Sequence, residues 1–167
     1  MFYIASTRFN NSTYKENIDY REKNKVSVIY GASLKIRNIY SHGVLIFVVE
    51  MNNEKNKIEG IGLIRNLLIC DKFYKIYENG EYNRYIYRGN YWLNREQLDA
   101  NDPEICEILD KVLFKGKSHL KNRIGITILT DKLFSHWIYE LRSLKYKIKC
   151  AFIHYYKGRH VNDTIYD

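Results

Sequence analysis

Two apolar segments of matching length constrain the fold of this chain more than any other feature. Residues 44–49 (VLIFVV) form a continuous apolar run after Gly43, and residues 58–64 (IEGIGLI) resume it beyond the polar stretch MNNEKNK. An unbroken apolar run of this length is typical of a β-strand covered on both faces. We therefore predict two adjacent antiparallel strands, joined by a hairpin with MNNEKNK at its tip. The two glycines in the second strand indicate a bulge, a barrel bend or a close approach by another backbone.

The rest of the chain reads as a succession of short strands and helices. An Asn-Gly turn at Asn79-Gly80 predicts a second hairpin, between residues 73–77 and 84–88. Further strands are predicted over residues 2–6, 26–30, 124–129 and 148–153. Helices are predicted over residues 14–20, 102–113 and 131–144. We therefore predict an α+β fold, a small and mainly antiparallel β-barrel with two or three peripheral helices, in a single domain over residues 1–167.

Length and composition limit the class of protein. A chain of 167 residues with 46% hydrophobic residues matches one globular domain. Its three cysteines, Cys70, Cys106 and Cys150, are far apart, which argues against a disulfide framework or a zinc site. The opening residues lack the pattern of a signal peptide, and the apolar runs are too short to span a bilayer. We expect an intracellular, cytoplasmic protein without membrane contact.

The sequence carries no recognisable catalytic signature. Hydrolase, zinc-protease and Walker motifs are missing, and Gly60-Ile61-Gly62 lacks the third glycine of a dinucleotide-binding loop. We therefore predict no catalytic residues, metal ligands or cofactor. An enzyme acting on nucleic acid is the weakest alternative, because no acid–base pair can be placed.

Clustered basic residues predict an anionic partner. The net charge is +8, and the segment FKGKSHLKNR reads as a loop in which Lys115, Lys117, Ser118, Lys121 and Arg123 could cradle phosphates. The alternative is an ordinary solvated surface. We also expect Arg88, which lies among tyrosines in EYNRYIYRGNYWLNRE, to pair with phosphate.

Aromatic and amide side chains are candidates for contact with a nucleobase. We expect a base to stack near Tyr30, Tyr91 or Trp92, and Asn52 or Asn53 to read its edge. The alternatives are half-buried sheet residues for the aromatic side chains and turn chemistry for the asparagine pair.

The order of these segments resembles the PUA-like superfamily, which includes the EVE, YTH and ASCH domains. The resemblance covers most of residues 2–129 and is carried by IYGASLKI, VLIFVVEMNNEKNKIEGIGLI, RYIYRGNYWL, the basic loop and GITIL. The stretch EMNN..NKIEGIGLI is also similar to uncharacterised proteins of large nucleocytoplasmic DNA viruses. The resemblance implies a small barrel that binds RNA or a modified nucleobase, as the YTH branch holds N6-methyladenine in an aromatic cage. Of the two cage tryptophans of that branch, only Trp92 has a matching position here.

These observations favour a non-catalytic domain that binds RNA or another single-stranded nucleic acid. The alternative is a structural or virion-assembly protein that binds other proteins, because interfaces are also rich in Tyr, Trp and Arg.

Overall fold

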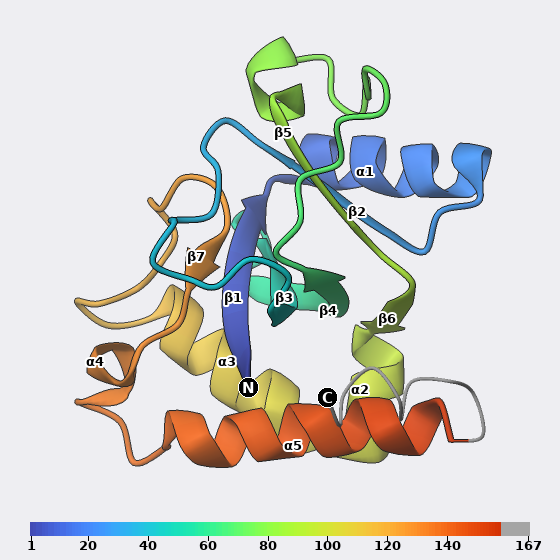
Figure 1. The fold of residues 1–167 in the computed structure, drawn as a ribbon. Helices are drawn as coiled ribbons and strands as arrows, with labels where there is room; N and C mark the ends of the chain where they lie inside the picture. The colour runs from blue at the N-terminus through green and yellow to red at the C-terminus, as the bar shows by residue number, and fades with distance from the viewer. Residues whose placement is uncertain (158–167) are drawn as a thin grey trace.

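A mixed five-stranded sheet forms the centre of the computed structural model, which describes residues 1–157 (Figure 1). Its strand order is β6-β4-β3-β1-β7. The strands are β1 (Phe2–Phe9), β3 (Leu45–Asn52), β4 (Lys57–Arg65), β6 (Tyr91–Asn94) and β7 (Thr127–Ile128). Strands β1 and β3 are parallel, and the other neighbouring pairs are antiparallel.

The hairpin predicted from the two apolar runs is confirmed. Strands β3 and β4 pair antiparallel from Leu45 opposite Arg65 to Asn52 opposite Lys57, with a register shift between Glu50 and Met51. All eight residues of β3 are buried, as expected of a strand covered on both faces.

The predicted antiparallel barrel is wrong. The ladders of residues 1–157 form two separate sheets, and the second contains only β2 (Val28–Ala32) and β5 (Tyr85–Gly89). The chain leaves β1 through helix α1 (Asn11–Asn24) and β2 before it enters β3. A crossover of this kind is what allows two strands to pair in parallel, so β3 runs beside β1 in the same direction.

In the described part of the chain, five helices, rather than the predicted two or three, surround these sheets. Besides α1 they are α2 (Arg95–Asn101), α3 (Pro103–Phe114), α4 (Asp131–Phe134) and α5 (Leu141–Tyr155), and a 3₁₀ helix, η1, spans Gly80–Asn83. Helix α3 confirms the predicted helix over residues 102–113. The predicted helix over residues 131–144 is instead the short α4 and the start of α5.

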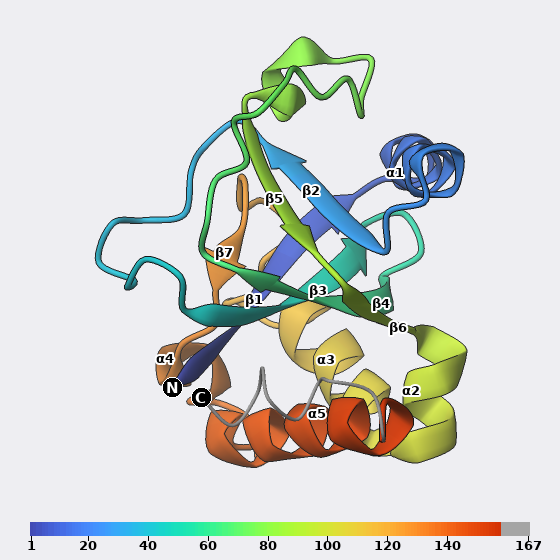
Figure 2. The ribbon, with the colours of Figure 1, turned by 45° about the vertical axis from the view of Figure 1, so that its right-hand side comes forward.

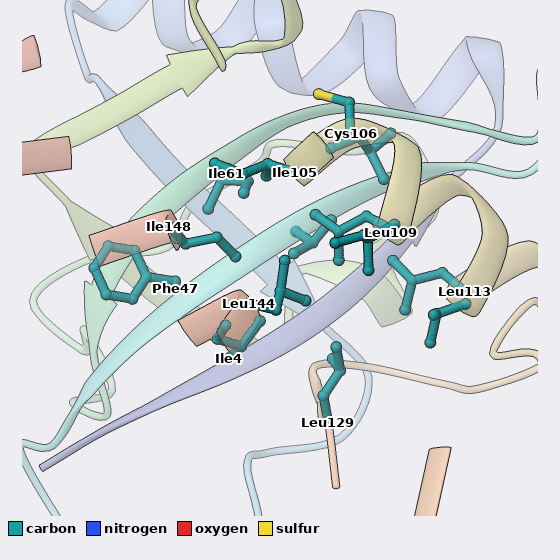
Figure 3. Close-up of a cluster of buried hydrophobic side chains, with 14 of the residues drawn as sticks. Ile4, Phe47, Ile61, Ile105, Cys106, Leu109, Leu113, Leu129, Leu144 and Ile148 are labelled. Atoms are coloured by element: carbon teal, nitrogen blue, oxygen red, sulfur yellow. The ribbon is translucent and has the colours of Figure 1, made fainter. Parts of the chain in front are cut away.

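The large sheet separates two hydrophobic layers. Helices α3 and α5 cover one face, and β2, β5 and α1 lie over the other (Figure 2). Figure 3 shows Phe47 and Ile61 of the sheet with Leu109 of α3 and with Leu144 and Ile148 of α5. Alternate residues of β3 serve the two layers, since Phe47 belongs to the helical layer whereas Ile46 packs with β2 and β5.

Two predicted strands are wrong. Residues 148–153 lie in α5, where the buried positions Leu144, Ile148, Ala151 and Phe152 follow the helical period. Residues 73–77 form no strand, because the side chain of Asn83 accepts the backbone N–H groups of Ile76 and Tyr77 and so replaces a strand partner. The predicted Asn-Gly turn is the start of η1, and β5 pairs with β2 instead.

A close approach between the two sheets explains Gly62 in β4. A Cβ atom at this position would lie 2.3 Å from the Tyr30 hydroxyl and 2.8 Å from Cγ1 of Val28. Both partners belong to β2, so the missing side chain lets the small sheet pack against the large one.

We predict that Gly62→Ala lowers the free energy of unfolding by about 1–3 kcal/mol, because the added methyl group overpacks this contact. Gly80→Ala is the matched control, since a Cβ there meets no atom within 4 Å. Urea unfolding of both variants measures the difference, and equal stabilities would contradict this account of Gly62.

Candidate functional site

Most of the predicted base-binding aromatic side chains surround a buried carboxylate. Tyr30 on β2 is 1% exposed and donates its hydroxyl to Oε1 of Glu50 at 2.8 Å. Trp92 on β6 is half-buried and donates its indole N–H to Oε2 of Glu50 at 3.2 Å. Tyr91 is half-buried, and its ring packs edge-on against Tyr156. Tyr30 therefore offers no surface to a base in this structure, and Trp92 has its polar edge occupied.

The buried carboxylate is balanced by an arginine from α1. Nη2 of Arg21 lies 2.6 Å from Oε1 of Glu50, and the two side chains are 5% and 0% exposed. The Arg21 guanidinium also lies 5.5 Å from the ring centroid of Tyr30 and 5.3 Å from that of Trp92. Burial, followed by the Glu50 carboxylate, raises the pKa of Tyr30 well above its ordinary value. The phenol therefore stays a neutral hydrogen-bond donor.

Sequence reasoning missed the role of Arg21 and Glu50. The available signal was an acidic residue at the end of an otherwise apolar strand, since such a charge must be either exposed or paired. Its partner lies 29 residues earlier, and no spacing pattern in the sequence indicates that pairing.

We predict strong coupling between Arg21 and Glu50. Arg21→Met or Glu50→Gln alone should lower the free energy of unfolding by about 3–5 kcal/mol, because each leaves a buried charge unpaired. The double variant should cost clearly less than the sum. Lys15→Met, which removes an exposed pair with Asp19, is the control and should cost less than about 1 kcal/mol. Additive effects in the double-mutant cycle would show that the pair is not coupled.

The two predicted base-reading asparagines occupy different environments. Asn52 is buried and fully engaged: its Nδ2 donates to Asn11 of α1 and to Glu59 of β4, and its Oδ1 accepts hydrogen bonds from the backbone N–H groups of Glu54 and Lys55. It therefore holds the turn. Asn53 donates its Nδ2 to the carbonyl oxygen of Lys121 at 2.9 Å, whereas its Oδ1 is buried without a partner.

A cavity of about 280 Å³ lies at the carboxyl end of β1, and we call it the end-of-β1 pocket. Strand β1, the start of α1, the end of β2, the β3–β4 turn and the segment before β7 contribute to it. Its lining residues are Thr7, Arg8, Phe9, Asn10, Thr13, Gly31, Ala32, Ser33, Asn53, Tyr77, Tyr82, Ile124 and Gly125. Polar side chains, two tyrosines and an asparagine whose amide oxygen has no partner therefore line one hollow.

Arg8 carries the only charge among the described lining residues of this pocket. Its Nη1 donates to the carbonyl oxygen of Lys121 at 2.9 Å, the same oxygen that accepts from Asn53. The backbone N–H of Asn11 at the start of α1 is already bonded to Glu54. The positive character of the pocket therefore depends on Arg8 rather than on the helix terminus.

The predicted basic loop borders this pocket. Lys121 anchors the loop, because its Nζ also donates to Oδ1 of Asn56 at 2.6 Å, and Ile124 and Gly125 line the cavity directly. The remaining predicted phosphate ligands of the loop are exposed: Lys115, Lys117, Ser118 and Arg123. Arg88 is exposed on β5 near Tyr74 and is not part of the lining.

Within residues 1–157 no group of three or more His, Cys, Asp and Glu side chains is placed to hold a metal ion. In the same part of the chain, no helix has the length and apolar character required to cross a membrane. Burial raises the pKa of the thiol of Cys106, a buried residue of α3, so this cysteine is an unreactive packing residue.

Comparison of the chain with protein-family models, with curated proteins and with solved structures finds no match in any of the three. The resemblance to the PUA-like superfamily and to viral proteins therefore stays a prediction.

Proposed function

We propose that the protein binds single-stranded nucleic acid and seats one nucleotide in the end-of-β1 pocket. The observation that carries this proposal is that Arg8, the Tyr77–Tyr82 pair and Asn53, whose buried Oδ1 has no partner, line one cavity beside the basic loop. Ligand sites combine an apolar wall with a few oriented polar groups, and this lining has that composition.

Tyr82 supplies the stacking surface. It is 38% exposed, and its ring packs against that of Tyr77, with the two ring centroids 6.1 Å apart and the planes nearly perpendicular. One face of an otherwise fixed ring is suited to a nucleobase, because every base has a π-face. In this proposal the nucleobase stacks on Tyr82, rather than on Tyr30, Tyr91 or Trp92 as predicted from the sequence.

Asn53 supplies the hydrogen bond to the base edge. Its orientation is fixed by the bond from Nδ2 to Lys121, which leaves Oδ1 as an acceptor for an N–H group of the ligand. A buried acceptor without a partner costs free energy, and a ligand that donates to it recovers that cost. The Oδ1 acceptor of Asn53 therefore favours nucleobases with an exocyclic amino or ring N–H group.

Arg8 and the loop supply the contacts to the backbone. A guanidinium offers five donors, and only Nη1 of Arg8 has a hydrogen-bond acceptor among the described residues. The exposed basic residues Lys115, Lys117 and Arg123 extend the positive surface away from the cavity. We therefore expect one nucleotide to bind in the pocket, while the neighbouring nucleotides of the strand lie along the basic loop.

We predict that Tyr82→Ala weakens binding of a single-stranded oligonucleotide by about 1–3 kcal/mol, the range found for loss of one stacked base. Phe73→Ala is the matched control, because Phe73 is an exposed aromatic side chain, 75% accessible, outside the lining. Fluorescence anisotropy measures both affinities, and equal losses would exclude Tyr82 as the stacking residue.

The basic loop should set the salt dependence of binding. Lys115→Ala combined with Lys117→Ala should reduce the slope of log affinity against log salt by about 1–2, since each neutralised phosphate contributes about 0.7 for single strands. Both side chains are exposed, so the melting temperature should not change. An unchanged slope would show that the loop does not contact phosphate.

A further inference from the structure

A second basic surface lies on α5, at the opposite end of β1 from the end-of-β1 pocket. Residues 141–155 contain an arginine and three lysines but no acidic residue. Three of these basic residues line a shallow hollow of about 420 Å³. The full lining is Phe2, Asp131, Leu141, Arg142, Lys145, Tyr146 and Lys149.

Two of these basic residues, Arg142 and Lys145, differ from Lys147 in what balances their charge. Lys147 lies 2.8 Å from Asp102 and 2.7 Å from Glu104, so it is neutralised within the fold. Arg142 and Lys145 form no ion pair with any residue of the described chain. Their charges are therefore available to an external anion.

Lys145 is held in place by aromatic rings rather than by an acid. Its Nζ lies 4.8 Å from the ring centroid of Phe2 and 5.8 Å from that of Tyr3. Burial lowers the pKa of Lys145, against a smaller opposing effect of Asp131. A partly desolvated cation with a fixed position gains more from an incoming anion than a fully hydrated one.

An exposed tyrosine ring lies beside these basic residues. Tyr146 is 70% exposed, and it lies one helical turn after Arg142 and next to Lys145. Residues four apart on a helix share a face. The surface therefore pairs cations with an accessible aromatic face, a combination that suits phosphates joined to bases better than an acidic peptide.

A continuous stretch of chain connects the two surfaces. Ile124 and Gly125 line the end-of-β1 pocket, β7 follows along the edge of the sheet, and Asp131 lines the hollow on α5. Strand β1 spans the same interval from Phe2 to Phe9, about 23 Å at the rise of a β-strand.

We propose that the α5 face is a second contact for the same single strand, with Arg142 and Lys145 binding phosphates and Tyr146 stacking a base. The strand runs from the end-of-β1 pocket along the β7 edge to α5. This inference rests on the proposed function and adds the direction and length of the bound strand.

The test compares an oligonucleotide of about 4 nucleotides with one of about 16, the limits reported for single-strand sites. The variant is Arg142→Gln combined with Lys145→Gln. The control, Lys23→Gln combined with Lys25→Gln, removes the same charge from exposed positions at the end of α1. Affinity is measured over a salt series, and melting temperatures verify that both variants fold.

The α5 variant should bind the long oligonucleotide on the order of tenfold more weakly, with a salt slope shallower by about 1–2. It should bind the short oligonucleotide as the unmodified protein does, and the control should affect neither. Equal affinities of the α5 variant and the control for the long oligonucleotide would overturn this inference, while binding that still depends on Tyr82 would leave the proposed function in place. If the unmodified protein binds neither oligonucleotide, the proposed function itself fails.

Discussion

The rest of the structure depends on one buried ion pair, between Arg21 and Glu50. A buried charge is costly unless an opposite charge lies beside it, so removing either partner of a buried ion pair is strongly destabilising. Here Glu50 on β3 also accepts bonds from Tyr30 on β2 and Trp92 on β6, while Arg21 comes from α1. A single carboxylate thus joins α1, both sheets and an edge strand. Those elements cannot shift independently without leaving a charge unpaired.

This constraint shapes the end-of-β1 pocket, although none of these four residues lines it. Helix α1 is tied to β3 by Arg21 near its last turn, and its first residues form a wall of the pocket. Strand β2 is tied by Tyr30, and the next residues, Gly31 to Ser33, form another wall. The buried ion pair and its hydrogen bonds therefore fix the positions of these two walls of the pocket. The aromatic side chains that hold the carboxylate are separate from Tyr82, which faces the cavity.

Local patterns predicted those elements whose partners lie nearby in sequence. The hairpin of β3 and β4 follows from two apolar runs around one polar turn, and Asn10 caps α1 through its own first turn. Patterns failed where a side-chain hydrogen bond or tertiary packing decided the outcome. The alternating segment around Tyr74 and Ile76 forms no strand, because Asn83 takes its backbone hydrogen bonds. Ile148 lies on a helix, because the apolar face of α5 completes the layer over the sheet.

The sequence by itself determined a fully buried central strand, a basic loop and a set of aromatic and amide side chains. Only the tertiary structure decided how these were used. It turned Tyr30 inward to a carboxylate, engaged Asn52 in a turn and left the buried Oδ1 of Asn53 without a partner in the lining that also contains Tyr82 and Arg8. The physical reason is that a side chain's residue type defines the bonds it can form, whereas burial and the geometry of distant strands determine which of those bonds remain available to a ligand.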